Sequence, residues 1–152
     1  MKYSLSSDTW DKEELQAIQD VIDSGRYTMG PKVSQFEKEF AEKFDVPYAV
    51  MVNSGSSANL LMWSCLKYKD KLEGDVIVPA VSWSTTYFPL IQNGFTPNFV
   101  DVDLDTMGLS PLALNNFLEE HAEVRDDGCY NKSSGRKISA CMPMHTFGFP
   151  VH

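Results

Sequence analysis

A short run of small polar residues, 53–57, is the first place where the sequence could do chemistry. It reads Asn-Ser-Gly-Ser-Ser and separates an apolar stretch from a helical pattern. A helix N-terminus presents unpaired backbone N–H groups and a positive dipole end, which suit a phosphate. Ser56 and Ser57 add hydroxyl donors, and Gly55 allows a close backbone approach. The run lacks the Lys of a Walker loop and the glycines of a dinucleotide fingerprint, so it indicates either a phosphate site or a serine-capped helix.

Two further candidate residues follow other predicted strands. Trp83 lies in the run 79–86 and could stack its indole on a planar ring, although a tryptophan packed in the core is the competing interpretation. His145 lies in the run 144–150, where a structural histidine is the competing interpretation. Ligands of open α/β sheets bind outside the carboxyl ends of the strands. Because all three candidates follow strands, we expect them at the same end of one sheet.

Helical and strand patterns alternate along the chain and predict an α/β fold. Apolar residues at helical spacing predict helices over residues 11–24, 31–44, 58–68, 84–92 and 111–121. Short apolar runs predict buried strands over residues 48–52, 76–78, 98–103 and 137–144, and a hairpin or loop is expected over 127–135. This alternation is typical of a mostly parallel sheet with crossover helices. Such a sheet needs cover on both faces, so we expect a truncated domain completed by a partner or by further chain.

Composition and charge argue against several classes of function. The chain has 152 residues, 43% of them hydrophobic, and a net charge of −8. An acidic chain without a basic stripe argues against nucleic acid or a membrane as the main partner. The N-terminus has no secretory signal, and the 3 cysteines are widely spaced, so we expect a cytoplasmic protein with reduced thiols. Cys141 and His145 lack a second pair of metal ligands, so no metal site is predicted.

These motifs together resemble the DegT/DnrJ/EryC1/StrS family of pyridoxal-phosphate-dependent sugar aminotransferases. The resemblance rests on ordered stretches along nearly the whole chain, at residues 30–31 with 36–37, 54–59, 74–79, 99–103 and 145–150. It implies that residues 1–152 form the N-terminal part of a fold-type I PLP-transferase large domain, within a much longer protein.

Two branches of the family are visible in different stretches. Residues 7–10, 28–30 and 78–87 are similar to 3-dehydratases that act on nucleotide-linked 4-keto-6-deoxysugars. Residues 108–111, 128–132 and 143–148 are similar to aminotransferases that make nonulosonic, legionaminic-type sugars. The two similarities do not agree on one substrate.

The resemblance also implies roles for the candidate residues. Ser56 and Ser57 match the family's phosphate-binding turn for pyridoxal 5'-phosphate, Trp83 matches the aromatic residue that stacks on the pyridine ring, and His145 matches a residue near the phenolic oxygen. The acid that pairs with the pyridine nitrogen has no match in the chain. Neither does the Schiff-base Lys, nor the His that replaces it in the dehydratases. We therefore name no catalytic residue and expect that this chain alone does not transaminate.

The leading hypothesis is the cofactor-binding portion of an aminotransferase. Such an enzyme would transfer an amino group from a donor, usually glutamate, to a nucleotide-linked keto-sugar, and the resemblance implies a homodimer with active sites at the interface. A nucleotide-sugar 3-dehydratase is the alternative within enzymes. A non-catalytic α/β fragment that binds no cofactor is the alternative of another class.

Overall fold

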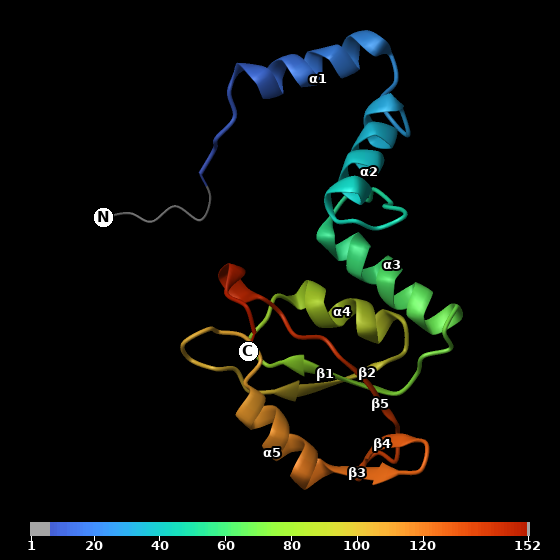
Figure 1. Ribbon diagram of the computed structural model, residues 1–152, viewed down its shortest axis with the longest axis vertical. Coiled ribbons are helices and arrows are strands. Elements are labelled where there is room, and N and C mark those ends of the chain that lie inside the picture. The colour runs from blue at the N-terminus through green and yellow to red at the C-terminus, as the bar shows by residue number, and fades with distance from the viewer. Residues whose placement is uncertain (1–6, 152) are drawn as a thin grey trace. The chain divides into compact units, whose positions relative to one another are not determined.

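The computed structural model describes residues 7–151 and divides into two compact units, Met1–Met51 and Val52–His152. Figure 1 shows the order of the helices and strands along the chain.

The first unit consists of helices α1 (Lys12–Ser24) and α2 (Pro31–Lys43) and the segment that follows them. The start of α1 has a capping box: the Asp11 carboxylate accepts from the N–H of Glu13 at 2.7 Å, and the Glu14 carboxylate accepts from the N–H of Asp11 at 2.8 Å. Gly25 ends the helix in a left-handed conformation at φ +66°. These local signals, and the Pro at the first position of α2, confirm both predicted helices.

The strand predicted over residues 48–52 is wrong. Tyr48 is 87% exposed and Val50 is 69% exposed. The backbone N–H of Met51 donates to the side-chain carboxylate of Glu37 on α2 at 2.9 Å. In a strand, this N–H would instead donate to a backbone carbonyl of the neighbouring strand. An apolar run becomes a strand only beside another strand, and none among the described residues pairs with this one.

The second unit contains a parallel sheet of 3 strands, in the order β2-β1-β5. The strands are β1 (Asp75–Pro79), β2 (Thr96–Val100) and β5 (Ile138–Cys141). The central strand β1 is buried along its whole length, as its continuous apolar run predicts. The last two strands are shorter than predicted, and β2 begins earlier than expected, at Thr96.

Alternate residues of β1 face two apolar layers. Val76 and Val78 pack with Trp63 on the side of α3 (Gly55–Tyr68) and α4 (Ser84–Gln92). Ile77 packs with Val100 on the other side, against α5 (Pro111–His121). Figure 1 shows α4 and α5 on opposite faces of the sheet. The predicted α/β architecture with crossover helices is confirmed.

An antiparallel hairpin and a short 3₁₀ turn complete this unit. The hairpin pairs β3 (Ala122–Arg125) with β4 (Gly128–Asn131), and the turn η1 spans Thr146–Gly148. The Tyr130 hydroxyl donates to the carboxylate of Asp127 at 2.8 Å. This bond lowers the pKa of Asp127 and raises the pKa of Tyr130, because it stabilises the charged carboxylate and the neutral phenol. The hairpin is one of the two outcomes expected for the polar excursion.

Candidate functional site

Helices α3 and α4 lie side by side and run in the same direction. Near their starts, the Asn59 side-chain amide donates to the Thr85 carbonyl at 3.0 Å. Near their ends, the Ser64 hydroxyl donates to the side-chain oxygen of Asn93 at 3.0 Å. The two N-termini therefore lie at the same end of the unit, which is also the end where β1 finishes, since α4 follows β1 through a short turn.

The polar turn at the start of α3 has some donors in use and others available. Ser54 caps the helix by accepting from the N–H of Ser57 at 3.2 Å, and the Ser57 hydroxyl donates to Asn53 at 2.6 Å. Among residues 7–151, no hydrogen-bond partner is found for the Ser56 side chain. A Cβ added at Gly55 would meet no atom within 4 Å, so the backbone there is open to a ligand. Ser56 and the backbone of Gly55 are thus the available donors, and Ser57 mainly holds the turn together.

A pocket of about 220 Å³ opens beside this turn, between the two helices. Its lining is polar at Ser56, Ser57, Thr85 and Gln92 and apolar at Leu60, Phe88 and Pro89. An anion here would be held by backbone N–H groups and hydroxyls at the positive end of the α3 dipole.

Trp83 is the N-cap residue of α4, and its side chain is 74% exposed. The interpretation as a core tryptophan is therefore wrong. The N–H of Thr86 donates to the Trp83 carbonyl at 2.9 Å, so the backbone of Trp83 is held by the first turn of the helix. The indole, by contrast, leaves a large apolar surface available to a planar ligand.

His145 follows the extended end of β5. Its Nδ1 accepts from the N–H of Val151 at 3.1 Å, which leaves Nε2 to carry the ring proton of the neutral imidazole. The preceding residue, Met144, contacts both Ser82 and Thr86 through its sulfur, so the end of β5 lies against the turn that carries Trp83.

The structure therefore brings all three candidate segments to one end of the sheet. The sequence-based reason for the first segment was wrong, because no strand among the described residues precedes residues 53–57. The parallel packing of α3 on α4 places the segment at this end instead. Strands β2 and β5 lie on opposite sides of β1, so the chain reverses its direction across the sheet after β2. Ligands of open α/β sheets bind at the carboxyl ends where such a reversal occurs.

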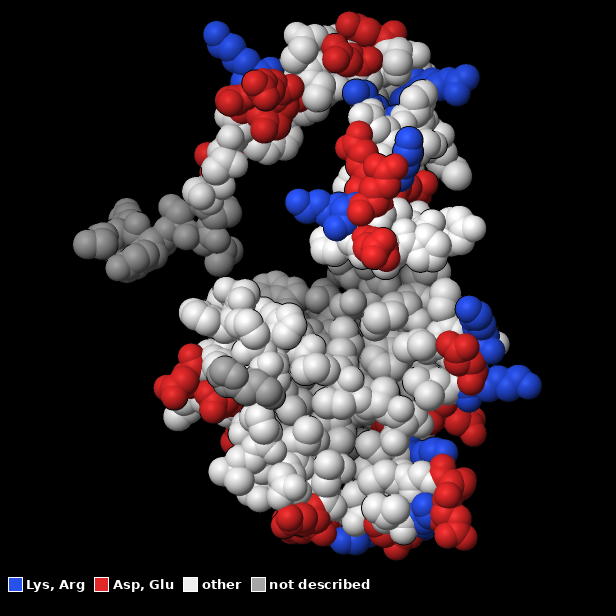
Figure 2. Space-filling model, viewed as in Figure 1, with Lys and Arg blue, Asp and Glu red and all other residues white. Residues whose placement is uncertain are grey.

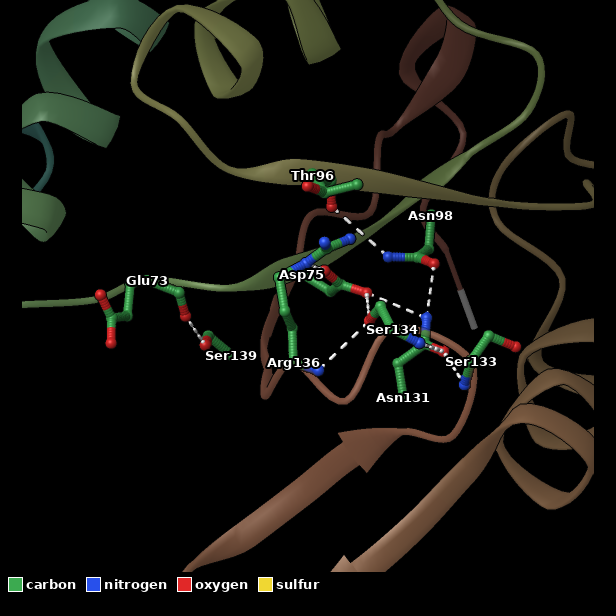
Figure 3. Close-up of polar contacts among 9 residues, drawn as sticks. All are labelled: Glu73, Asp75, Thr96, Asn98, Asn131, Ser133, Ser134, Arg136 and Ser139. Atoms are coloured by element: carbon green, nitrogen blue, oxygen red, sulfur yellow. Dashed lines mark hydrogen bonds and ion pairs between the residues drawn. The ribbon is translucent and has the colours of Figure 1, made fainter.

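A second polar cluster, which the sequence reasoning missed, lies at the opposite end of β1 (Figure 3). Asp75 is 0% exposed, and its carboxylate binds the guanidinium Nε of Arg136 at 2.6 Å. It also accepts from the side-chain amide of Asn131 at 2.9 Å and from the Ser134 hydroxyl at 3.3 Å. An Asp at the start of an otherwise apolar strand is the one sequence signal of this cluster. Because Asn131 ends β4, the cluster fastens the hairpin to the sheet.

The surface charge and the metal-ligating residues concern other classes of ligand. On the face shown in Figure 2, basic and acidic side chains are interspersed, with no continuous basic area of the kind that follows a nucleic-acid backbone. Within residues 7–151, no group of His, Cys, Asp and Glu side chains could hold a metal ion. None of the helices in this part of the chain is long and apolar enough to cross a membrane.

Known proteins similar to this chain include nucleotide-sugar enzymes. A GDP-4-keto-6-deoxy-D-mannose 3-dehydratase from Yersinia pseudotuberculosis is 52% identical over 128 residues, which cover 82% of this chain and 33% of that protein. The solved structure of a GDP-4-keto-6-deoxy-D-mannose-3-dehydratase from E. coli, with bound hydrated PLP, superposes with a TM-score of 0.70 at 46% identity over 84% of this chain and 32% of that one.

A more distant structure extends the fold comparison to the whole chain. The Helicobacter pylori aminotransferase PseC, involved in the biosynthesis of pseudoaminic acid, superposes with a TM-score of 0.78 at 22% identity, covering 100% of this chain and 36% of that one. The chain thus spans about a third of the length of the relatives that it matches. The sequence profile of the DegT/DnrJ/EryC1/StrS aminotransferase family matches residues 8–152, and the chain belongs to this family.

Proposed function

We propose that this chain forms the N-terminal, cofactor-binding part of a nucleotide-sugar enzyme that uses pyridoxal 5'-phosphate, and that the reaction is a 3-dehydration. The observation that supports the proposal is the common end of α3 and α4, where Ser56 with its open donors and the exposed Trp83 both begin a helix. A phosphate on a flat ring needs these two surfaces together. When bound, the cofactor supplies an electron sink, and the protein supplies binding and orientation.

Each residue has a distinct task in this proposal. Ser56 and the N–H of Gly55 hold the phosphate, with the dipole of α3 in place of a cationic side chain. Trp83 covers one face of the ring, fixes its plane and excludes water from that face. His145 would offer its Nε2–H to a ring substituent, because Nδ1 is already occupied by the N–H of Val151. Ser57 keeps the turn in shape through Asn53.

Dehydration is preferred over amino transfer because of the similarity to the dehydratases of Yersinia pseudotuberculosis and E. coli, at 52% and 46% identity. This preference reverses the order of the two enzyme hypotheses drawn from the sequence. The substrate class is then a GDP-linked 4-keto-6-deoxysugar. Amino transfer from a donor such as glutamate stays the second candidate, because residues 143–148 are similar to the aminotransferase branch.

Cofactor binding can be tested with pyridoxamine phosphate, which lacks the aldehyde that would react with surface lysines. Binding is followed by cofactor absorption and by quenching of tryptophan fluorescence, with inorganic phosphate as a competitor. Ser56→Ala removes one hydrogen bond to a charged group, worth about 1.5 kcal/mol or more, so we expect affinity to fall about tenfold. Ser64→Ala, on the same helix and bound to Asn93, is the control and should bind as the unaltered chain does.

Two results would overturn the proposal. One is the absence of any spectral change at millimolar pyridoxamine phosphate, which would favour a non-catalytic fragment. The other is equal loss of binding in the two serine variants. The reaction class is tested in the longer protein by incubation with the keto-sugar nucleotide and glutamate, followed by mass spectrometry. Dehydration yields a sugar that lacks its 3-hydroxyl oxygen, whereas amino transfer adds a nitrogen. The expected homodimer is tested on the same sample by sedimentation equilibrium.

A further inference from the structure

The side chain of Met144 lies where two hydroxyl groups of the neighbouring turn meet. The Ser82 and Thr86 hydroxyls are 2.6 Å apart, and the Met144 sulfur contacts both of them. Thr86 is 2% exposed, so its hydroxyl has little access to water and needs a partner in the protein. A thioether carries no hydrogen and can only accept. A consistent arrangement therefore has Ser82 donating to Thr86 and Thr86 donating to Met144.

These hydroxyls lie on both sides of Trp83 along the chain. Ser82 directly precedes Trp83, and the N–H of Thr86 donates to the Trp83 carbonyl at 2.9 Å. With 74% of its side chain exposed, the indole gains little orientation from packing. Its position relative to the strand ends must then come from its backbone, and the contacts of Ser82 and Thr86 with Met144 are what join that backbone to the end of β5.

Met144 is itself held on a rigid support. Two residues earlier, the N–H of Met142 donates to the Ile77 carbonyl of β1 at 2.9 Å, which continues the strand ladder past β5. On the other side, the Met144 carbonyl lies against Gly108, where an added Cβ would approach it to 3.3 Å. A contact with such a fixed segment transmits position, whereas one with a loose loop would not.

From these contacts we infer that Met144 is a positioning residue for Trp83, and that it sets the distance between the indole and His145, the next residue in the chain. The role rests on the proposed cofactor site: Trp83 would lie on the ring face and His145 at its edge, and Met144 would join the two. Met144 touches neither cofactor nor substrate and acts through Ser82 and Thr86. The sulfur matters as an acceptor, so a side chain of equal size without one should fail.

The test compares Met144→Leu, which keeps the size and removes the acceptor, with Met144→Gln, which keeps an acceptor. Met142→Leu is the matched control, since Met142 precedes Met144 on the same extension and packs against the apolar layer of α3 and α4. The 152-residue chain is labelled with 5-fluorotryptophan, and Trp83→Phe assigns the Trp83 resonance in the fluorine NMR spectrum. Pyridoxamine phosphate affinity is measured on the same samples, and circular dichroism verifies folding.

We expect Met144→Leu to shift or broaden the Trp83 resonance before any cofactor is added, and to weaken pyridoxamine phosphate binding about threefold to tenfold, the effect of one lost hydrogen bond. Met144→Gln should restore both readouts in large part, and Met142→Leu should leave both unchanged. An unchanged Trp83 resonance or unchanged affinity in Met144→Leu, or equal effects of the Met142 and Met144 variants, overturns the positioning role alone. An unaltered chain that binds no pyridoxamine phosphate overturns the proposed function and, with it, this role.

Discussion

Replacing Arg136 by Ala tests whether the polar cluster at the amino end of β1 is an anchor of the fold. The variant leaves the Asp75 carboxylate, which is 0% exposed, with the neutral donors of Asn131 and Ser134 only. Breaking a fully buried ion pair in this way costs about 3–5 kcal/mol. Because the Arg136 side chain is 48% exposed and keeps part of its hydration, we expect a smaller loss. About 2 kcal/mol of unfolding free energy is a reasonable value, within the range for hydrogen bonds to charged groups.

The neutral variant Asp75→Asn separates charge from shape. Asn131 and Arg136 both donate to the carboxylate, so the new amide would direct its own N–H donor at one of these two donors. The single change should therefore also destabilise the protein. However, an amide does not require a cation in the way that a buried carboxylate does. Adding Asp75→Asn to Arg136→Ala should therefore be neutral or stabilising, although each change is destabilising alone.

Urea unfolding, followed by tryptophan fluorescence and circular dichroism, measures these differences. With an m-value of about 1–2 kcal/mol/M for a unit of this size, a loss of 2 kcal/mol lowers the midpoint by about 1–2 M. Lys137→Ala is the control, since this neighbouring cation binds an exposed backbone carbonyl and should count for less than about 0.5 kcal/mol. The reasoning fails if Arg136→Ala shifts the midpoint no more than this control does, or if the double variant is less stable than Arg136→Ala.

Three further outcomes follow from other parts of the structure. Trp83→Ala should weaken pyridoxamine phosphate binding about fivefold, from the loss of roughly 1 kcal/mol of stacking, without lowering the melting temperature, because the side chain is 74% exposed. The hydrogen bond to Asp127 is the main reason that the pKa of Tyr130 is raised, so the phenol stays neutral until the pH rises above the ordinary value of 10.0. In Asp127→Ala, an ultraviolet pH titration should therefore find that Tyr130 ionises at lower pH. Desolvation by its surroundings raises the pKa of the Cys141 thiol, although the residue is exposed. At pH 8, iodoacetamide should therefore alkylate it more slowly than glutathione, as peptide mass spectrometry can measure; equal rates would contradict this account of its environment.

Features that depend on a few neighbouring residues could be predicted from the sequence. The capping box of Asp11 and Glu14 and the serine cap of Ser110 are features of this kind, because each joins groups within three residues of one another. The central strand was predictable because a run buried on both faces must be apolar throughout.

Predictions that needed a distant partner were less successful. The apolar run 48–52 was predicted as a strand but pairs with none among the described residues. In α3, Leu61, Cys65 and Tyr68 share one side by helical spacing, yet Trp63 is the buried residue and Tyr68 is 75% exposed. Helical spacing defines the residues of a face, but only the sheet and α4 decide which face is covered.

For the candidate site, the sequence by itself determined the chemical groups: hydroxyls in the turn of Ser56, an indole at Trp83 and an imidazole at His145. Tertiary structure decided that these groups share one end of the sheet. That result depends on the parallel packing of α3 on α4, through Asn59 and Thr85, and on the contact of Met144 with the turn before α4. Residues 26 or more positions apart make these contacts, and local patterns carry no information about which distant segments will pack together.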